Sequence, residues 1–233
     1  PDISLAVLGD PMNSLMASRA AAGMLAPFGE CSKADRFFRF CRESLLQYPD
    51  FIKDLISTSD IPVHLSMKGS LIPSSSLGND WEKRIRFFRE ENIPHEIWSP
   101  ARCQQLAPAL AESCGEVIWV GEGQVNNREM HDALVVASRK LGVEILEKNV
   151  TGFVHDSSIV EAAVTNTLEV RSQKFILASG SWSSQLGDAL DVSLPLKPIK
   201  GQMCRVQVED DRLDYTVHGL TTYIAPWKGG KGF

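Results

Sequence analysis

Small residues are dense between positions 17 and 27, where the sequence reads ASRAAAGMLAP. A segment with so little side-chain bulk lets backbone amides approach a ligand closely. Ser18 adds a hydroxyl group, and the amides of the loop can bind a pyrophosphate or the edge of a flat ring. A closely packed helix start would have the same composition. The residues by themselves leave these two interpretations open.

Other patterns that could support chemistry are weak. The segment GSWSS at 180–184 does not fit a hydrolase elbow, because Trp182 stands where the nucleophilic serine would be. The five histidines lack the close spacing of zinc ligands, so we expect no metal site. Neither G-x-G-x-x-G nor the phosphate-binding P-loop pattern occurs. No side chain is nominated as a catalytic acid or base.

The composition limits the possible partners and location. The chain has 233 residues, a formal net charge of −5, 43% hydrophobic residues and 23% charged residues. These values are ordinary for a globular protein, and the acidic balance argues against a nucleic-acid partner. No apolar stretch approaches the ~18 residues of a membrane span. The five cysteines include no C-x-x-C pair, which indicates free thiols in a reducing compartment, so we expect a cytoplasmic protein.

Two apolar runs predict the buried parallel strands of an α/β fold. The first covers residues 3–8, and the second covers residues 175–178 and ends in Ser179 and Gly180. A strand that ends in small residues lets the backbone meet a ligand at the carboxyl edge of a sheet. Between these runs, a helix capped by Asn126 in a capping box with Glu129 leads directly into a strand at 143–146.

The remaining patterns predict further helices and strands. We expect a helix over residues 31–57 that Pro49 breaks or kinks, and a second helix over residues 81–88. A single strand over residues 63–72 followed by a loop, and an antiparallel meander, complete the prediction. The meander comprises residues 150–155, 159–164 and 168–170.

Both ends of the sequence look as if they were cut through structure. The chain starts at Pro1 without a recognisable leader and enters a strand almost at once. At the other end, a strand at 222–225 is followed by a glycine turn, and Phe233 begins what should be the returning strand. We therefore expect an internal piece of a longer protein, whose first strand has an open edge that can pair with a second copy.

Several segments resemble, in the same order, those of glycine oxidases, the flavoenzymes of thiamine biosynthesis in the D-amino-acid oxidase and sarcosine oxidase family. The segments are residues 18–27, 121–128, 177–183, 198–202 and 223–226. The resemblance implies an α/β fold that contains part of a Rossmann-like FAD-binding domain and a mixed-sheet α+β substrate domain, truncated at both ends. It assigns residues 1–60 and 115–190 to the FAD-binding domain, and residues 61–114 and 191–233 to the substrate domain.

The resemblance also implies which residues contact FAD and substrate. Gly9 and Asp10 would end the second Rossmann strand beside the adenosine ribose, and Val150 would meet the adenine. Tyr223 would lie over the substrate side of the flavin. The other implied FAD contacts are Ala17, Ser18, Ala22, Gly23, Met24, Ala178, Ser179 and Gly180.

The implied activity is oxidation of the C–N bond of a small amino acid or amine, by hydride transfer to FAD and reoxidation by molecular oxygen. A dehydrogenase of the same fold with another electron acceptor stays open as an alternative. So does a non-enzymatic module, because Gly9 stands where the family usually has glutamate and Trp227 where it often has arginine. The glycine fingerprint and the arginine that binds the substrate carboxylate are not among the matched segments.

Overall fold

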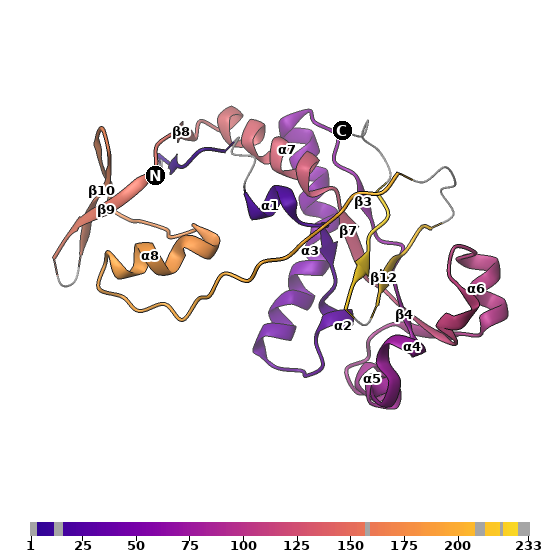
Figure 1. Ribbon diagram of the computed structural model, residues 1–233. Helices are drawn as coiled ribbons and strands as arrows, with labels where there is room; N and C mark the ends of the chain where they lie inside the picture. Colours follow the sequence, from indigo (N-terminus) through magenta and orange to yellow (C-terminus); the bar gives the residue numbers. More distant parts are fainter. Residues whose placement is uncertain (1–3, 12–15, 157–158, 208–212, 220, 228–233) are drawn as a thin grey trace. The chain divides into compact units, whose positions relative to one another are not determined.

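The computed structural model describes residues 4–11, 16–156, 159–207, 213–219 and 221–227. The chain forms two compact units, each with its own sheets (Figure 1). The first unit comprises Pro1–Ser14 and Ser138–Cys204, and the second comprises Leu15–Ala137 and Arg205–Phe233. These boundaries differ from those of the two domains expected above, and that domain assignment stays a prediction.

The first unit contains a pair of parallel strands, both of which were predicted as strands. Strand β1 (Ala6–Leu8) pairs in parallel with β8 (Glu144–Leu146). The strand is not buried as predicted, because Leu5 is 51% exposed and Val7 is 45% exposed. Among the described residues β8 is the one strand that pairs with β1, so the other edge of β1 has no paired strand.

The predicted meander is confirmed in the same unit. Strands β9 (Val150–His155), β10 (Val160–Thr165) and β11 (Glu169–Arg171) form an antiparallel sheet in the order β11-β10-β9 (Figure 1). The predicted strand at 175–178 is wrong: these residues have no regular structure and Ile176 is 85% exposed. An apolar run needs a hydrogen-bonding neighbour to become a strand, and no described strand lies beside this one. The 3-10 turn η3 (Gly180–Trp182) and helix α8 (Ser183–Asp188) follow.

The second unit contains a mixed sheet of the kind expected for a substrate domain. Its five strands have the order β13-β12-β4-β6-β5, in which β12 and β4 are parallel and the other neighbours are antiparallel. The strands are β4 (Ser70–Pro73), β5 (His95–Trp98), β6 (Val117–Val120), β12 (Thr216–His218) and β13 (Tyr223–Ile224). A smaller antiparallel sheet joins β2 (Met24–Leu25), β7 (Gly123–Val125) and β3 (Leu65–Ser66).

The single strand predicted for residues 63–72 is in fact two strands in different sheets. Gly69 lies between β3 and β4 with a φ of +103°, an angle that residues other than glycine rarely adopt. A Cβ atom there would also lie 2.2 Å from the Trp119 indole nitrogen. The loop expected after this strand is instead a short helix, α4 (Ser74–Leu77).

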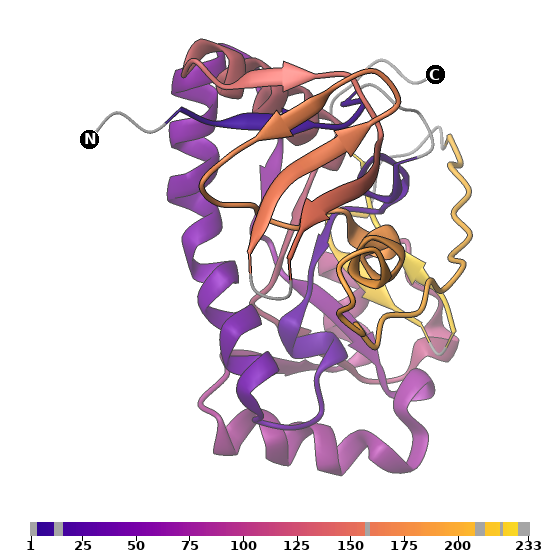
Figure 2. The same ribbon diagram turned by 90° about the vertical axis from the view of Figure 1, so that its left-hand side faces the viewer.

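Helix α3 (Arg36–Ser59) continues through Pro49, which was expected to break or kink it (Figure 2). Pro49 is exposed, so water can bind the carbonyl group that the missing N–H leaves unpaired. The helix is held on both sides of the proline, because Leu45 packs in one apolar cluster and Ile52 and Leu55 pack in another.

The other helices agree with their sequence patterns. The second predicted helix is α5 (Trp81–Glu90), and the helix after Asn126 is α7 (Asn127–Lys140). Asn126 Oδ1 accepts from the backbone N–H groups of residues 128 and 129, as a cap should. The capping box is incomplete, because Glu129 accepts from the backbone N–H of His64 rather than from Asn126. The short helices are α1 (Ala17–Ala20), α2 (Pro27–Glu30) and α6 (Pro100–Leu106), with 3-10 turns η1 (Gly78–Asp80) and η2 (Glu112–Cys114).

Candidate functional site

The small-residue segment is docked against the start of α7. The Asn127 side-chain amide donates to the backbone oxygen of Ser18, and Arg128 Nε donates to that of Arg19 at 3.1 Å. Gly23 has a φ of +79°, and a Cβ atom there would lie 1.9 Å from the carbonyl oxygen of Val125. Glycine at position 23 is therefore required by packing within the chain itself, whether or not a ligand is bound.

The exposed side of this segment fits a group that contacts the backbone. Ala17 and Ser18 are exposed, and Ala22 and Met24 are half-buried. Beside them Asn127, which is 5% exposed, holds a buried Oδ1 atom without a hydrogen-bond partner among the described residues. Little side-chain bulk next to an unused buried acceptor is suited to a ligand with N–H or O–H groups. These residues therefore fit the FAD role that the resemblance implied.

The remaining predicted cofactor residues lie in the first unit. Gly9 follows β1 and donates its N–H to the carbonyl oxygen of Leu146 at 3.0 Å, and Asp10 is exposed. Val150 opens β9, and its neighbours Asn149 and Thr151 help to line a hollow of about 300 Å³.

The end of the second predicted strand also belongs to the first unit. Ala178 and Gly180 are exposed, while the Ser179 and Ser183 hydroxyl groups lie 3.0 Å apart. The predicted site residues are thus divided between the two units. Gly9, Asp10, Val150, Ala178, Ser179 and Gly180 lie in the first unit, and Ala17, Ser18, Ala22, Gly23, Met24 and Tyr223 lie in the second.

Tyr223, the predicted substrate contact, lies on the edge strand of the five-stranded sheet. The residue is 51% exposed, and its ring meets the His218 ring edge-on, with centroids 5.2 Å apart. Partial burial, together with the negative charge of Glu30, raises the pKa of the Tyr223 phenol above its usual value. The hydroxyl group is therefore a neutral hydrogen-bond donor and acceptor over the whole physiological pH range.

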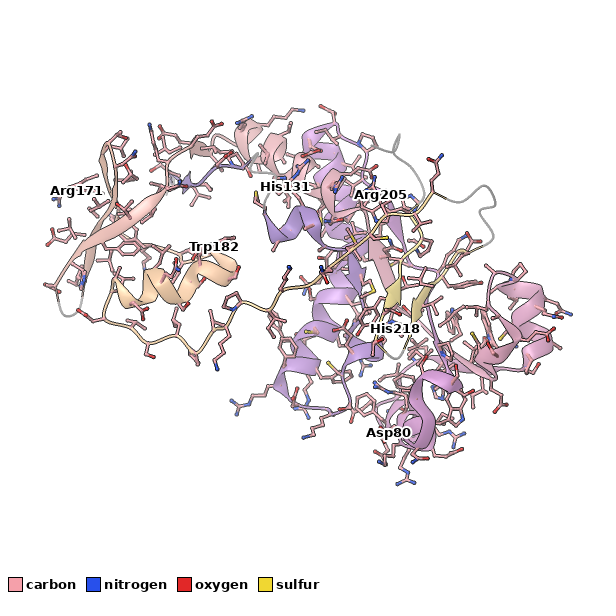
Figure 3. All side chains as sticks on the ribbon, in the orientation of Figure 1. Asp80, His131, Arg171, Trp182, Arg205 and His218 are labelled. Atoms are coloured by element: carbon pink, nitrogen blue, oxygen red, sulfur yellow. The ribbon has the colours of Figure 1, made fainter. Side chains whose placement is uncertain are left out.

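Sequence reasoning missed a buried pair behind Tyr223. Glu122 is fully buried between β6 and β7, and its Oε1 accepts from the N–H groups of Phe28 at 2.5 Å and Gly29 at 2.6 Å. The other oxygen, Oε2, lies 3.5 Å from Nε2 of His218, which is 5% exposed on β12 (Figure 3). The available signal was an acid flanked by two glycines between two strands, which a solvent-exposed turn would show as well.

Arg84 completes the polar interior around α2. Its Nη1 donates to the backbone oxygens of Phe28 at 3.0 Å and Cys31 at 2.5 Å. Burial lowers the pKa of the Arg84 guanidinium, and the nearby Glu122 carboxylate opposes that effect. The backbone N–H groups of α2 are therefore bound by the Glu122 carboxylate, and carbonyl groups at its C-terminal side are bound by the Arg84 guanidinium.

Trp227 contacts two guanidinium groups. The Arg205 group lies 4.1 Å from the centre of the indole ring, and the Arg128 group lies 5.8 Å from it. Positive charge is therefore present beside position 227, although the residue itself is not the arginine that the resembling family often has there.

Comparison with known families identifies the chain's relatives. Residues 12–232 match the family model DAO, described as "FAD dependent oxidoreductase". The chain belongs to this family. Gly9 and Asp10 precede the matched region, so the family match supports no role for them. Across the described residues, no helix is long and apolar enough to cross a membrane.

Proteins similar to this chain carry several names. A "Bifunctional protein ThiO/ThiG" from Trichormus variabilis is 30% identical over 90% of this chain, which spans 32% of that protein. A "Glycine oxidase" from Geobacillus kaustophilus is 26% identical over 92% of the chain, which spans 58% of it. A "D-amino acid dehydrogenase" from Bradyrhizobium diazoefficiens is 28% identical over 54% of the chain and 31% of its own length.

The fold is that of the glycine oxidases. The crystal structure of glycine oxidase from Geobacillus kaustophilus superposes with a TM-score of 0.86 and 25% identity, covering 95% of this chain and 61% of that one. The α/β architecture with several sheets, expected as part of a flavoenzyme fold, is confirmed by this likeness. The chain thus spans about three fifths of a structure of this type.

Proposed function

We propose that the chain is part of an FAD-dependent oxidase that acts on the C–N bond of a small amino acid or amine. The observation that carries this proposal is the likeness to glycine oxidase, which extends over 95% of the chain with a TM-score of 0.86. Membership of the DAO family over residues 12–232 supports the flavin cofactor. When bound, FAD would accept the hydride from the carbon that carries the amine.

The chain's own residues would bind the cofactor and orient the substrate. Exposed Ala17 and Ser18, with Gly23 and the unused Asn127 oxygen beside them, would hold the cofactor through backbone and amide contacts. Tyr223 would offer its hydroxyl group to the substrate. Orienting the substrate and excluding water is the protein's share of such a reaction, and the proposal requires no general base among the described residues.

The electron acceptor, the cellular location and the pathway are also part of this proposal. We take molecular oxygen as the electron acceptor, the cytoplasm as the location and thiamine biosynthesis as the pathway, because relatives that match 90% and 92% of the chain are named ThiO/ThiG and glycine oxidase. A dehydrogenase that passes electrons to another acceptor is the second candidate. It is favoured by the relative named D-amino acid dehydrogenase.

One assay separates these candidates. The protein that contains this chain, purified with its flavin, would be mixed with glycine, other small amino acids or secondary amines, and oxygen uptake and peroxide would be recorded. We expect stoichiometric peroxide with at least one of these amines. Reduction of a dye without oxygen uptake would support the dehydrogenase instead. A protein that holds no flavin would contradict both and support the non-enzymatic module.

A further inference from the structure

Glu122 is fully buried inside the second unit, and one of its two carboxyl oxygens is already bound. Two backbone N–H groups of α2 donate to its Oε1. Arg84, which binds the carbonyl side of the same helix, adds positive charge nearby. A buried carboxylate needs a donor for its second oxygen as well.

His218 supplies the nitrogen that faces that second oxygen. Oε2 of Glu122 and Nε2 of His218 lie 3.5 Å apart, and neither atom makes a hydrogen bond with any of the described residues. An acceptor-only carboxylate facing an imidazole nitrogen is satisfied when that nitrogen carries the proton. The geometry therefore assigns the proton of His218 to Nε2.

The imidazole ring in turn supports Tyr223. Residues 218 and 223 are cross-strand partners in the β12–β13 pair, and their rings are nearly perpendicular at 87°. On its other side, the ring lies where a Cβ atom of Gly29 would be, 2.4 Å from Cε1. The His218 ring therefore packs between Gly29 of α2 and the Tyr223 ring of the edge strand.

We propose that Glu122 and His218 form a buried pair, joined through the Nε2 proton, that positions Tyr223 on the substrate side of the enzyme. The pair links α2, the β6–β7 connection and the β12–β13 hairpin, three segments far apart in the sequence. Both are positioning residues rather than catalytic ones, since they act through Tyr223. The role toward substrate rests on the proposed function, whereas the proton assignment does not.

Nitrogen NMR of the histidine rings tests the proton assignment directly. In the flavin-loaded protein, the His218 signals, identified by their loss in His218→Gln, should show a protonated Nε2. In Glu122→Gln, the amide oxygen can still accept from α2, while its NH₂ group faces Nε2 and forces the proton to Nδ1. His64→Gln, at an exposed position, is the matched control and should leave the His218 signals unchanged.

Kinetics test the positioning role. For the amine that gives turnover, Glu122→Gln and His218→Leu should raise KM about five-fold, as expected for one lost hydrogen bond, with kcat per flavin little changed. His218→Gln, which keeps an N–H at the same reach, should recover most of the loss. If Nε2 of His218 carries no proton in the unsubstituted protein, the proposed pair is wrong, and this result needs no variant. Correct NMR signals in a protein without oxidase activity would overturn the proposed function but leave the pair standing.

Discussion

At the scale of single residues, Tyr223 combines an exposed phenol with a buried imidazole behind it. Tyr223→Phe removes the hydroxyl group and keeps the ring that contacts His218. We expect KM for the amine to rise about five-fold, because one substrate hydrogen bond is lost, while flavin content stays the same. Steady-state kinetics and the visible spectrum measure both quantities. Loss of flavin with unchanged kinetics per remaining flavin would contradict the assignment.

The raised pKa of Tyr223 predicts the sign of a pH effect. A phenol whose folded-state pKa lies above its unfolded value stabilises the fold below the unfolded pKa, and that contribution is lost as pH rises through the folded pKa. The unsubstituted protein should therefore lose stability more steeply above about pH 10 than Tyr223→Phe does. Urea unfolding at pH 8 and at pH 11 measures the difference. Equal losses in the two proteins would show that the environment of Tyr223 does not disfavour its ionisation.

Gly29 tests the packing of His218 without removing a polar group. Gly29→Ala would place a Cβ atom 2.4 Å from the imidazole, so we expect a loss of about 1–3 kcal/mol in the free energy of unfolding. Gly152→Ala is the matched control, because no atom lies within 4 Å of its added Cβ. That control should change the free energy by less than about 1 kcal/mol, in the stabilising direction. Similar effects at the two positions would mean that His218 can move aside.

At the scale of elements, Pro49 lies on the exposed side of a helix that continues through it. Pro49→Ala restores the N–H that can bond to the carbonyl group of Leu45, so we expect the free energy of unfolding to rise by about 1–3 kcal/mol. Urea unfolding measures this change, and the m-value should stay the same. Asp50→Ala, at the next exposed position, controls for helix propensity and should gain no more than about 0.7 kcal/mol. A destabilised Pro49→Ala protein would show that the fold depends on a bend at this position.

The elements also show which features sequence patterns can predict. The helix after Asn126 and the meander were predicted because cap, periodicity and turn residues act over a few positions. The strand at 175–178 was wrong because a strand requires a partner, which its own residues do not specify. The site shows the same limit. Gly23 stands out within its own local segment, and its role toward FAD stays a prediction. Glu122 and His218 come together only through the tertiary fold, because 96 residues (218 − 122) separate them in the sequence.

At the scale of the whole molecule, the chain spans 61% of the glycine oxidase structure it resembles and contains no G-x-G-x-x-G segment. We therefore expect the 233-residue chain alone to bind FAD far below one equivalent and to be inactive. Without the glycine turn that binds a pyrophosphate, several charge-assisted hydrogen bonds of about 1.5–3 kcal/mol each are lost. The test is to add FAD, remove the excess and record the visible spectrum. A stoichiometric flavin band would contradict this prediction.

The parallel pair of β1 and β8 imposes a waiting time on the growing polypeptide. Ala6 pairs with Glu144, so 144 − 6 = 138 residues separate the partners, and most of the second unit is translated between them. At about 5–20 residues per second, β1 leaves the ribosome roughly 7 to 28 s before its partner exists. Throughout that interval Leu5 and Val7 remain on an unpaired strand, the kind of segment that chaperones bind and that aggregates when they do not. Only the Leu15–Ala137 part of the second unit has that time to fold, because β12 and β13 follow β8 in the chain.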